Sequence, residues 1–243
     1  KEGQENILYL LRCAWSGCQK YGAVVWCGDI HSTFESLQNQ FAAGLNMGIA
    51  GIPWWTTDIG GFFGANIYDE SYHEVFVRWF ESGAFCPVMR LHGYRMPYQP
   101  QFGTTGGAEC VSGAPNEIWS YGDQVYEICK KYISIRETMR PYTRELMREA
   151  HEKGTPVMRP LFYDFPEDTV CWENEKEYMY GPNILVAPVM ERGEKTKEVY
   201  LPAGTRWTNV WTKEAFEGGQ TVTVATPLDQ IPLFTREGYT LEV

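Results

Sequence analysis

Residues 23–62 decide the fold: they open with AVVWCGDI (23–30) and close with GIPWWTTDIGGF (51–62). Each end is an apolar run that finishes in an aromatic group followed by a lone aspartate, Asp29 or Asp58. Between them, residues 36–48 have the spacing of an amphipathic helix. We therefore predict strand, helix and strand, with both aspartates at the carboxyl ends of parallel strands. Carboxylates beside aromatic rings in that position suggest sugar chemistry.

Two more strands of the same type flank this unit. The run NILYLLR (6–12) is almost continuously apolar, which predicts a strand buried on both faces that ends in Arg12. After a helix predicted over 71–83, residues 86–91 predict a fourth strand, which ends at His92. Four strands thus each deliver one charged or titratable group. A β/α barrel brings such strand ends together at one site.

The strand count leaves a second fold open. A closed barrel needs eight parallel strands, and only four are visible in this part of the chain. An open doubly wound sheet also places strand ends along one edge. No GxGxxG follows any of the strands, so a nucleotide-binding role is not favoured.

The second half of the chain changes character near residue 154. Before this point we expect a loop over 93–115 and a long helix over 117–152. Pro141 should kink or divide that helix. Short strand-like runs separated by Gly, Pro, Asp and Asn then predict a small antiparallel β-sandwich. We therefore expect one domain over 1–153 and a β-sandwich domain over 154–243.

Composition excludes several classes of protein. The formal net charge is −10 and no basic stripe is present, so we expect no nucleic-acid partner. No apolar run is long enough for a membrane span, and no membrane partner is expected. The seven cysteines are odd in number and contain no CxxC pair; we read them as reduced, which favours a cytoplasmic protein. The four histidines lack zinc-like spacing, and we expect no cofactor.

Each candidate residue also has a simpler role. Asp29 is a possible helix cap and Asp58 a possible support for the Gly-Gly turn. Arg12 is a possible structural ion partner of Asp29, His92 a structural histidine, and Phe62 a core residue. The Trp-Cys-Gly segment before the first aspartate favours a ligand site, because glycine admits close approach and the indole lowers the local polarity. The joint pattern at four strand ends is the evidence for function.

Several motifs in order resemble glycoside hydrolase family 31, the retaining α-glucosidases and α-xylosidases. They are WCGD (26–29), TDIGGF (57–62), GAFCPVMRLHG (83–93), PVMRPLFYDFPED (156–168), YMYGPNILVAPV (178–189), YLPAG (200–204) and LDQIPLFTREG (228–238). The resemblance covers essentially the whole chain. It implies the second half of a (β/α)8 TIM barrel, strands five to eight, followed by a small antiparallel β-sandwich domain.

The resemblance also implies roles for single residues. Asp29 matches the general acid/base of the family, and Trp26 matches the tryptophan that lines the subsite for the reacting sugar. The expected substrate-binding residues are Arg12, Trp26, Asp58, Phe62 and His92. The family's nucleophilic aspartate has no counterpart in this chain, so we expect it upstream of Lys1, with the first half of the barrel as a missing partner.

The expected function is retaining hydrolysis that releases α-linked glucose or xylose from non-reducing ends. Transglycosylation and α-glucan lyase chemistry on the same fold remain alternatives, as does a carbohydrate-binding or structural fragment that is inactive alone. An open half-barrel leaves strand edges and apolar surface exposed, so self-association into a homo-oligomer is also possible. Neither the choice between glucose and xylose nor the linkage follows from the sequence.

Overall fold

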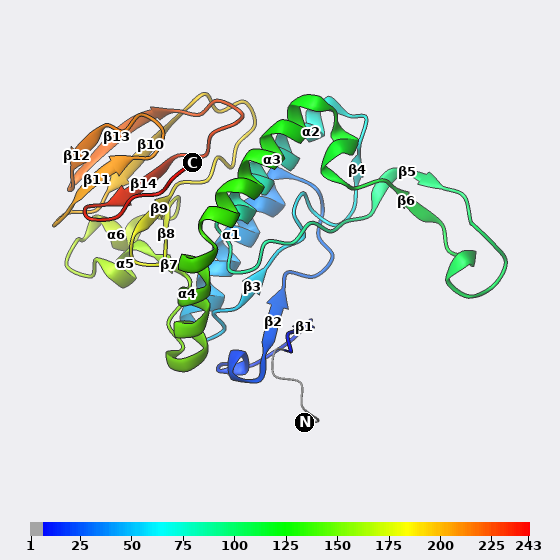
Figure 1. Cartoon of the computed structure of the whole chain (residues 1–243), viewed down its shortest axis with the longest axis horizontal. Helices are drawn as coiled ribbons and strands as arrows, with labels where there is room; N and C mark the ends of the chain where they lie inside the picture. The colour runs from blue at the N-terminus through cyan, green and yellow to red at the C-terminus, as the bar shows by residue number, and fades with distance from the viewer. Residues whose placement is uncertain (1–6) are drawn as a thin grey trace.

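The computed structural model describes residues 7–243, and its first sheet is parallel (Figure 1). The sheet has three strands in the order β1 (Tyr9–Leu11), β2 (Ala23–Trp26) and β3 (Trp55–Thr56). β2 starts the opening segment 23–30, as predicted, whereas β3 begins only at Trp55 within the closing segment 51–62. Pro53 has no N–H for a ladder, which explains the later start.

The prediction of a first strand buried on both faces is wrong. Residues Tyr9, Leu10 and Leu11 are 50%, 43% and 38% exposed. Within residues 7–243, β1 pairs with β2 alone and forms the edge of the sheet. The first residue of the predicted strand, Asn6, lies outside the described residues.

The fourth predicted strand, over 86–91, does not form a regular ladder. The segment does run parallel to the β3 segment: the N–H of Val88 donates to the carbonyl of Trp55 at 3.3 Å, and Leu91 forms an isolated parallel bridge with Ile59. Pro87 contributes no N–H, which removes one position from the ladder. His92 therefore still follows a segment that lies beside β3.

Four helices lie where the periodicity predicts helical structure, except that the long helix begins at Asp123 rather than at 117, after a 3-10 turn over Ile118–Tyr121. α1 (Phe34–Ile49) begins after its N-cap Thr33, whose hydroxyl accepts the N–H of Ser36 at 3.1 Å. α2 (Glu70–Ala84) begins after Asp69, which caps it in the same way. The long helix is divided in two, as Pro141 suggested: α3 (Asp123–Thr138) and α4 (Arg140–Lys153) meet at Met139.

The expected loop over 93–115 contains regular structure. It folds into a β-hairpin of β5 (Arg95–Gln99) and β6 (Ser112–Ala114), which are antiparallel and enclose a short 3-10 turn (Gly106–Glu109). β4 (Ala65–Asn66) pairs with β5 in parallel. Figure 1 shows this hairpin as an arm that projects from the body of the molecule.

The second half of the chain forms two antiparallel sheets. Six strands lie in the order β12 (Ala215–Glu217), β11 (Arg206–Asn209), β14 (Leu233–Arg236), β9 (Ile184–Val186), β8 (Tyr178–Tyr180) and β7 (Met158–Pro160). β10 (Thr196–Leu201) pairs with β13 (Gln220–Ala225) as a separate ribbon. Two one-turn helices, α5 (Leu161–Asp164) and α6 (Val170–Glu173), connect β7 to β8.

The central strands of the six-stranded sheet are buried on both faces. Successive side chains point to opposite sides, so each of these strands contributes to two cores. On β8, Tyr178 and Tyr180 belong to the core that the sheet shares with α1, α2 and α3. Met179 between them belongs to a second core, which lies between this sheet and the β10–β13 ribbon. The parts before and after residue 154 thus share one hydrophobic core.

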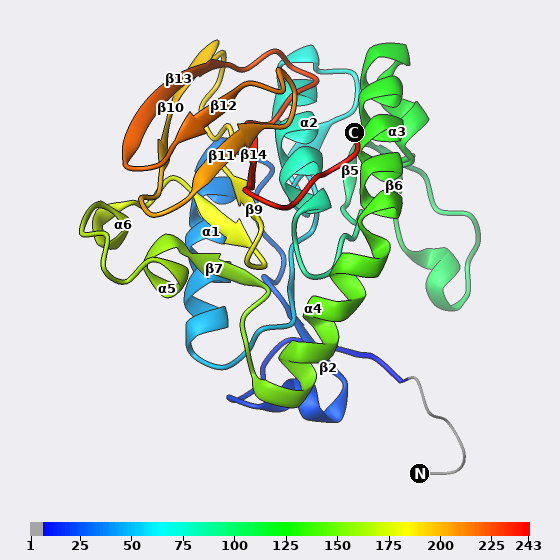
Figure 2. The same cartoon turned by 60° about the vertical axis from the view of Figure 1, so that its left-hand side comes forward.

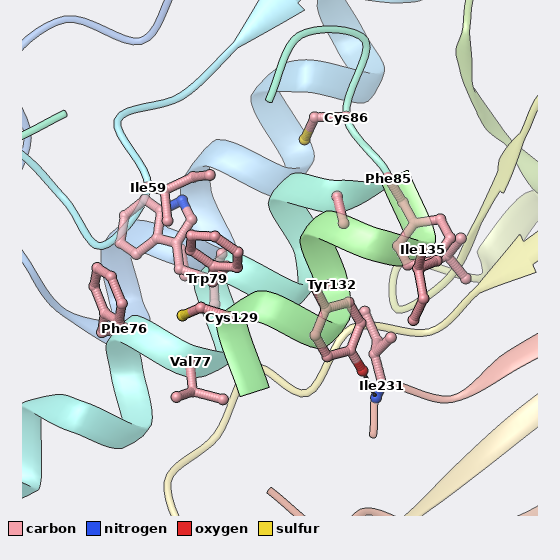
Figure 3. Packing of buried hydrophobic residues seen from close by; sticks show 14 of the residues in the cluster. Ile59, Phe76, Val77, Trp79, Phe85, Cys86, Cys129, Tyr132, Ile135 and Ile231 are labelled. Atoms are coloured by element: carbon pink, nitrogen blue, oxygen red, sulfur yellow. Dashed lines mark hydrogen bonds between the residues drawn. The ribbon is translucent and has the colours of Figure 1, made fainter. Parts of the chain in front are cut away.

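Figure 3 shows the helical side of that shared core. Trp79 and Phe76 of α2 lie against α3, and Tyr132 of α3 reaches Ile231. The Tyr132 hydroxyl accepts the N–H of Ile231 at 2.9 Å, so the buried phenol is satisfied. No helix within residues 7–243 has the length and apolar character needed to cross a membrane.

Arg95 holds the turn that follows Asp58. Its fully buried guanidinium donates to the carbonyl oxygens of Gly61 at 2.7 Å and Ile59 at 3.2 Å. Its Nε donates to the hydroxyl of Tyr121 at 2.9 Å. Gly60 and Gly61 both have positive φ, 83° and 77°, the region that favours glycine. Backbone carbonyls, rather than a carboxylate of the described chain, therefore compensate this buried charge.

Replacing Arg95 by methionine should destabilise the fold strongly. The substitution conserves much of the volume but leaves several buried acceptors unpaired, so we expect the free energy of unfolding to fall by about 3–5 kcal/mol. Urea titration followed by tryptophan fluorescence measures the change. The control is Arg206→Met, which removes an exposed ion pair to Glu217 and should cost less than about 1 kcal/mol. Equal losses in the two variants would contradict this account.

Stability should also fall between about pH 4.5 and 7, because burial raises the pKa values of Glu81 and Glu177 to about 7. The folded state then binds more protons than the unfolded state in this window, so the free energy of unfolding decreases as the pH rises. Glu177→Gln should flatten that slope, because it removes one of the two titrating carboxyls. The carboxamide oxygen can still accept the N–H of Tyr200, so the structure around it is retained. Urea titrations at several pH values test this, with exposed Glu175→Gln as a control that leaves the slope unchanged. A slope unaltered by Glu177→Gln would refute the assignment.

Candidate functional site

Two neighbouring strands place Asp29 and Asp58 at the same edge of the parallel sheet. β2 ends at Trp26 and β3 at Thr56, and the N–H of Cys27 still donates to the carbonyl of Thr56 at 3.3 Å. The two chains therefore leave the sheet side by side before each reaches its aspartate. The helix-cap role of Asp29 is excluded, because Thr33 caps α1.

Asp29 lies in an accessible cluster with Arg12 and Trp26. A guanidinium nitrogen of Arg12 is 3.1 Å from a carboxylate oxygen of Asp29, and the guanidinium lies 5.1 Å from the centre of the Trp26 ring. The structural ion pair considered for Arg12 is thus present. Its side chains are 69% and 39% exposed, so the apolar pocket expected around Asp29 is not formed within residues 7–243. Such an exposed pair adds little stability and leaves the carboxylate open to a ligand.

Asp58 lies in the opposite environment. It is fully buried, and one of its carboxylate oxygens pairs with Arg90. Burial raises the pKa of Asp58, while the positive charges of Arg90 and His92 act to lower it and the charge of Asp29 raises it further. These three charged groups, which come from two different segments, all lie close enough to Asp58 to affect its pKa.

The second oxygen of Asp58, Oδ2, has no hydrogen-bond partner within residues 7–243. A buried oxygen without a partner is costly, and it is a ready acceptor for a ligand hydroxyl. The side chain therefore does not support the Gly-Gly turn; only the backbone carbonyl of Asp58 does so, by accepting the N–H of Gly61 at 2.8 Å.

Phe62 and His92 complete the predicted set. Their ring centroids are 5.6 Å apart with planes inclined at 40°. Phe62 is held by its N–H, which donates to the carbonyl of Ile30 at 2.8 Å. His92 makes no side-chain hydrogen bond within the described part of the chain, so the role of a satisfied structural histidine is not supported.

One member of the site, Arg90, was not predicted from the sequence. It lies within the quoted GAFCPVMRLHG motif, two residues before His92, and alternation along an extended segment could have placed both on one side. It is the only side chain that pairs with Asp58 among residues 7–243.

Other groups at this edge are less suited to chemistry. Burial raises the pKa of Cys27 to about 12, so this residue is a neutral thiol at physiological pH and a poor nucleophile or metal ligand. No group of three or more His, Cys, Asp or Glu side chains within residues 7–243 is placed to hold a metal ion. The chemistry available is that of one accessible carboxylate and one buried carboxylate, surrounded by donors and aromatic rings.

Comparison with known proteins agrees with this arrangement. Residues 1–146 match the glycosyl hydrolases family 31 TIM-barrel domain, and residues 154–241 match the glycosyl hydrolase family 31 C-terminal domain. The first match favours the β/α barrel over the doubly wound sheet.

Individual proteins that resemble this chain are named as alpha-xylosidases and alpha-glucosidases. The chain is 39% identical to an alpha-xylosidase of Saccharolobus solfataricus over 99% of its own length and 31% of the relative's. It is 35% identical to alpha-glucosidase 2 of Bacillus thermoamyloliquefaciens, covering 94% of this chain and 26% of that protein.

Among solved structures, a GH31 alpha-xylosidase from a soil metagenome, complexed with xylose, matches with a TM-score of 0.94 and 52% identity. The match covers 98% of this chain and 36% of that one. A GH31 dextranase of Flavobacterium johnsoniae, complexed with glucose, matches with a TM-score of 0.82 and 33% identity over 96% of this chain and 27% of that one. The chain thus spans about a third of the length of its relatives or less. Because the two family matches together extend over nearly all of its residues, the chain belongs to the family 31 glycosyl hydrolases.

Proposed function

We propose that this chain supplies the acid/base half of the active site of a retaining α-glycosidase. The observation that carries the proposal is the contrast between two neighbouring carboxylates. Asp29 is accessible beside Arg12 and Trp26, and Asp58 is buried with one oxygen unpaired. The named activities of the relatives, alpha-xylosidase and alpha-glucosidase, support the same class of reaction.

In this proposal Asp29 is the general acid/base. It protonates the oxygen of the leaving group and then removes a proton from the water that enters. Arg12 keeps the carboxyl oriented through the 3.1 Å ion pair. Solvent reaches Asp29 in the described chain, as the second step requires.

Asp58 is assigned to the substrate rather than to bond cleavage. A nucleophilic carboxylate must face the anomeric carbon, at about 5–5.5 Å from the acid/base carboxyl. Asp58 is instead enclosed and paired with Arg90, with a single free oxygen that suits a sugar hydroxyl. His92 and Phe62 form the adjoining wall. Hydrogen bonds to hydroxyls that tighten in the oxocarbenium-like transition state lower the barrier.

The proposed nucleophile is an aspartate in a longer protein, on barrel strands that precede those described. The relatives are about three times as long as this chain, which supports the presence of such a segment. In the same proposal, residues 1–153 form strands five to eight of the barrel, and residues 154–243 form the β-sandwich domain that packs on them through the shared core. An α-xyloside is the first substrate to test, because the relative that is 52% identical is an alpha-xylosidase.

Loss of Asp29 should slow hydrolysis according to the leaving group. In a chimera where this chain replaces the matching part of the soil-metagenome alpha-xylosidase, Asp29→Ala should lower kcat/KM for alkyl α-xylosides by about 10²–10⁴. The loss should be smaller for aryl xylosides with acidic phenols, which leave without protonation. Azide should restore turnover and yield the α-xylosyl azide, since it needs no general base.

Three comparisons complete this experiment. Glu167→Ala, on the loop between α5 and α6, should leave the chimera unchanged. The isolated 243-residue chain should show no turnover if its nucleophile lies in a longer protein. An Asp29→Ala chimera that cleaves alkyl xylosides at the parent rate would overturn the assignment, and turnover by the isolated chain would overturn the proposed position of the nucleophile.

Arg90 should control the ionisation of Asp58. In Arg90→Met the burial that raises the pKa of Asp58 remains, while the opposing charge is lost, so the pKa should rise further. ¹³C NMR of labelled aspartate carboxyls measures this shift in the 243-residue chain. The chimera should show a KM about tenfold higher as hydroxyl binding weakens. Arg90→Lys keeps the charge and should show the smaller pKa shift; indistinguishable titrations in all three proteins would contradict the assigned role.

A further inference from the structure

A second concave site lies between the two halves of the chain. It is a groove of about 660 Å³, with one wall formed by the outer side of α1, at Ala42 and Asn46. The other wall contains Phe162 of α5 and Trp172 of α6. Figure 2 shows α1 beside these short helices. The volume lies within the range of small-molecule sites, and none of the residues assigned to the candidate active site lines it.

The groove carries a rigid aromatic surface. The rings of Phe162 and Trp172 stack with centroids 4.7 Å apart and planes inclined by only 10°. The indole N–H of Trp172 donates to the carbonyl of Pro166 at 2.9 Å, which fixes the ring further. Trp172 is nevertheless 58% exposed. An immobilised but exposed tryptophan loses little conformational entropy when a ligand packs against it.

Polar side chains surround this aromatic surface. Asn46 on α1 and Glu175 and Glu191 on the opposite wall line the groove, and their side chains make no hydrogen bond or ion pair within residues 7–243. An apolar ligand would cover these groups without satisfying them. Lys176 and Lys197 also line the groove and balance the charges of Glu175 and Glu191, so the lining has no net charge that would favour an anionic or a cationic ligand. The remaining match is a neutral ligand with an apolar face and several hydroxyls.

We propose that this groove is a second sugar-binding site, which holds one or two neutral pyranose units outside the active site. The C–H face of a pyranose packs on the free surface of an aromatic ring, and its equatorial hydroxyls reach the amide of Asn46 and the two glutamates. The choice of sugars as the ligand class rests on the proposed glycosidase function. The site would hold a neighbouring part of an oligosaccharide and raise its local concentration.

The isolated 243-residue chain tests the proposal without any turnover. Isomaltotriose and methyl α-D-xylopyranoside are titrated while the indole N–H signal of Trp172 is followed by ¹H–¹⁵N NMR. We expect saturable shifts with dissociation constants of about 1 mM. Trp172→Ala should weaken the binding at this site at least about tenfold, followed on the backbone signal of Asn46. The matched control is Trp119→Ala, which removes a tryptophan that is 67% exposed and lies outside the groove.

A blocking variant keeps the test valid if Trp172→Ala unfolds. Ala42→Trp fills the groove from the exposed side of α1 and removes no existing contact, and it should abolish the shifts while the thermal midpoint stays unchanged. Asp58→Asn should leave groove binding intact, so a failure of the proposed active site is recognised separately. Absence of saturable shifts with both sugars, or unchanged binding in both Ala42→Trp and Trp172→Ala, would overturn the proposal.

Discussion

The structure depends on a sheet that has no solvent-facing side over its central strands. Along β8 the tyrosines enter the core shared with α1, α2 and α3, while Met179 enters the core beneath the β10–β13 ribbon. Arg136 of α3 strengthens this junction: its guanidinium donates to the carbonyl of Ala84 and the hydroxyl of Tyr180, both at 2.8 Å. Because the two halves share their apolar contacts, the parallel strand ends are held on a scaffold that includes residues far along the chain.

That scaffold gives the two aspartates different environments. Asp29 follows a short turn after β2 and remains accessible. Asp58 is buried, pairs with Arg90 and precedes the turn whose carbonyls bind Arg95. A buried carboxylate with one unsatisfied oxygen suits recognition of a hydroxyl, and an accessible one suits proton exchange with solvent. Both positions are aspartates, so the different roles that we propose, acid/base for Asp29 and hydroxyl binding for Asp58, follow from their burial.

The helices were predictable from the sequence because their periodicity, their caps and Pro141 agree with one another. Features whose pairing or burial depends on distant residues were not predictable. The run over 6–12 is apolar enough for a central strand, yet β1 lies at the edge in the described chain. The hairpin arm was expected to be a loop because its segment, 93–115, is rich in Gly, Pro and Gln. The role of Arg90 was not predicted, because its partner Asp58 is 32 residues away in the chain.

The sequence by itself determined the order of the first three strands and of helices α1 to α4, the change to antiparallel structure after residue 154, and the strand-end positions of Asp29 and Asp58. Apolar period and turn residues are local properties, and they suffice for those features. Only the tertiary structure decided which aspartate is buried and which is exposed, and that Arg90 pairs with the buried Asp58. It alone also brought α1 beside the Phe162–Trp172 stack to form the groove. Burial, ion pairing and concavity arise between segments that are remote in sequence, so no local pattern encodes them.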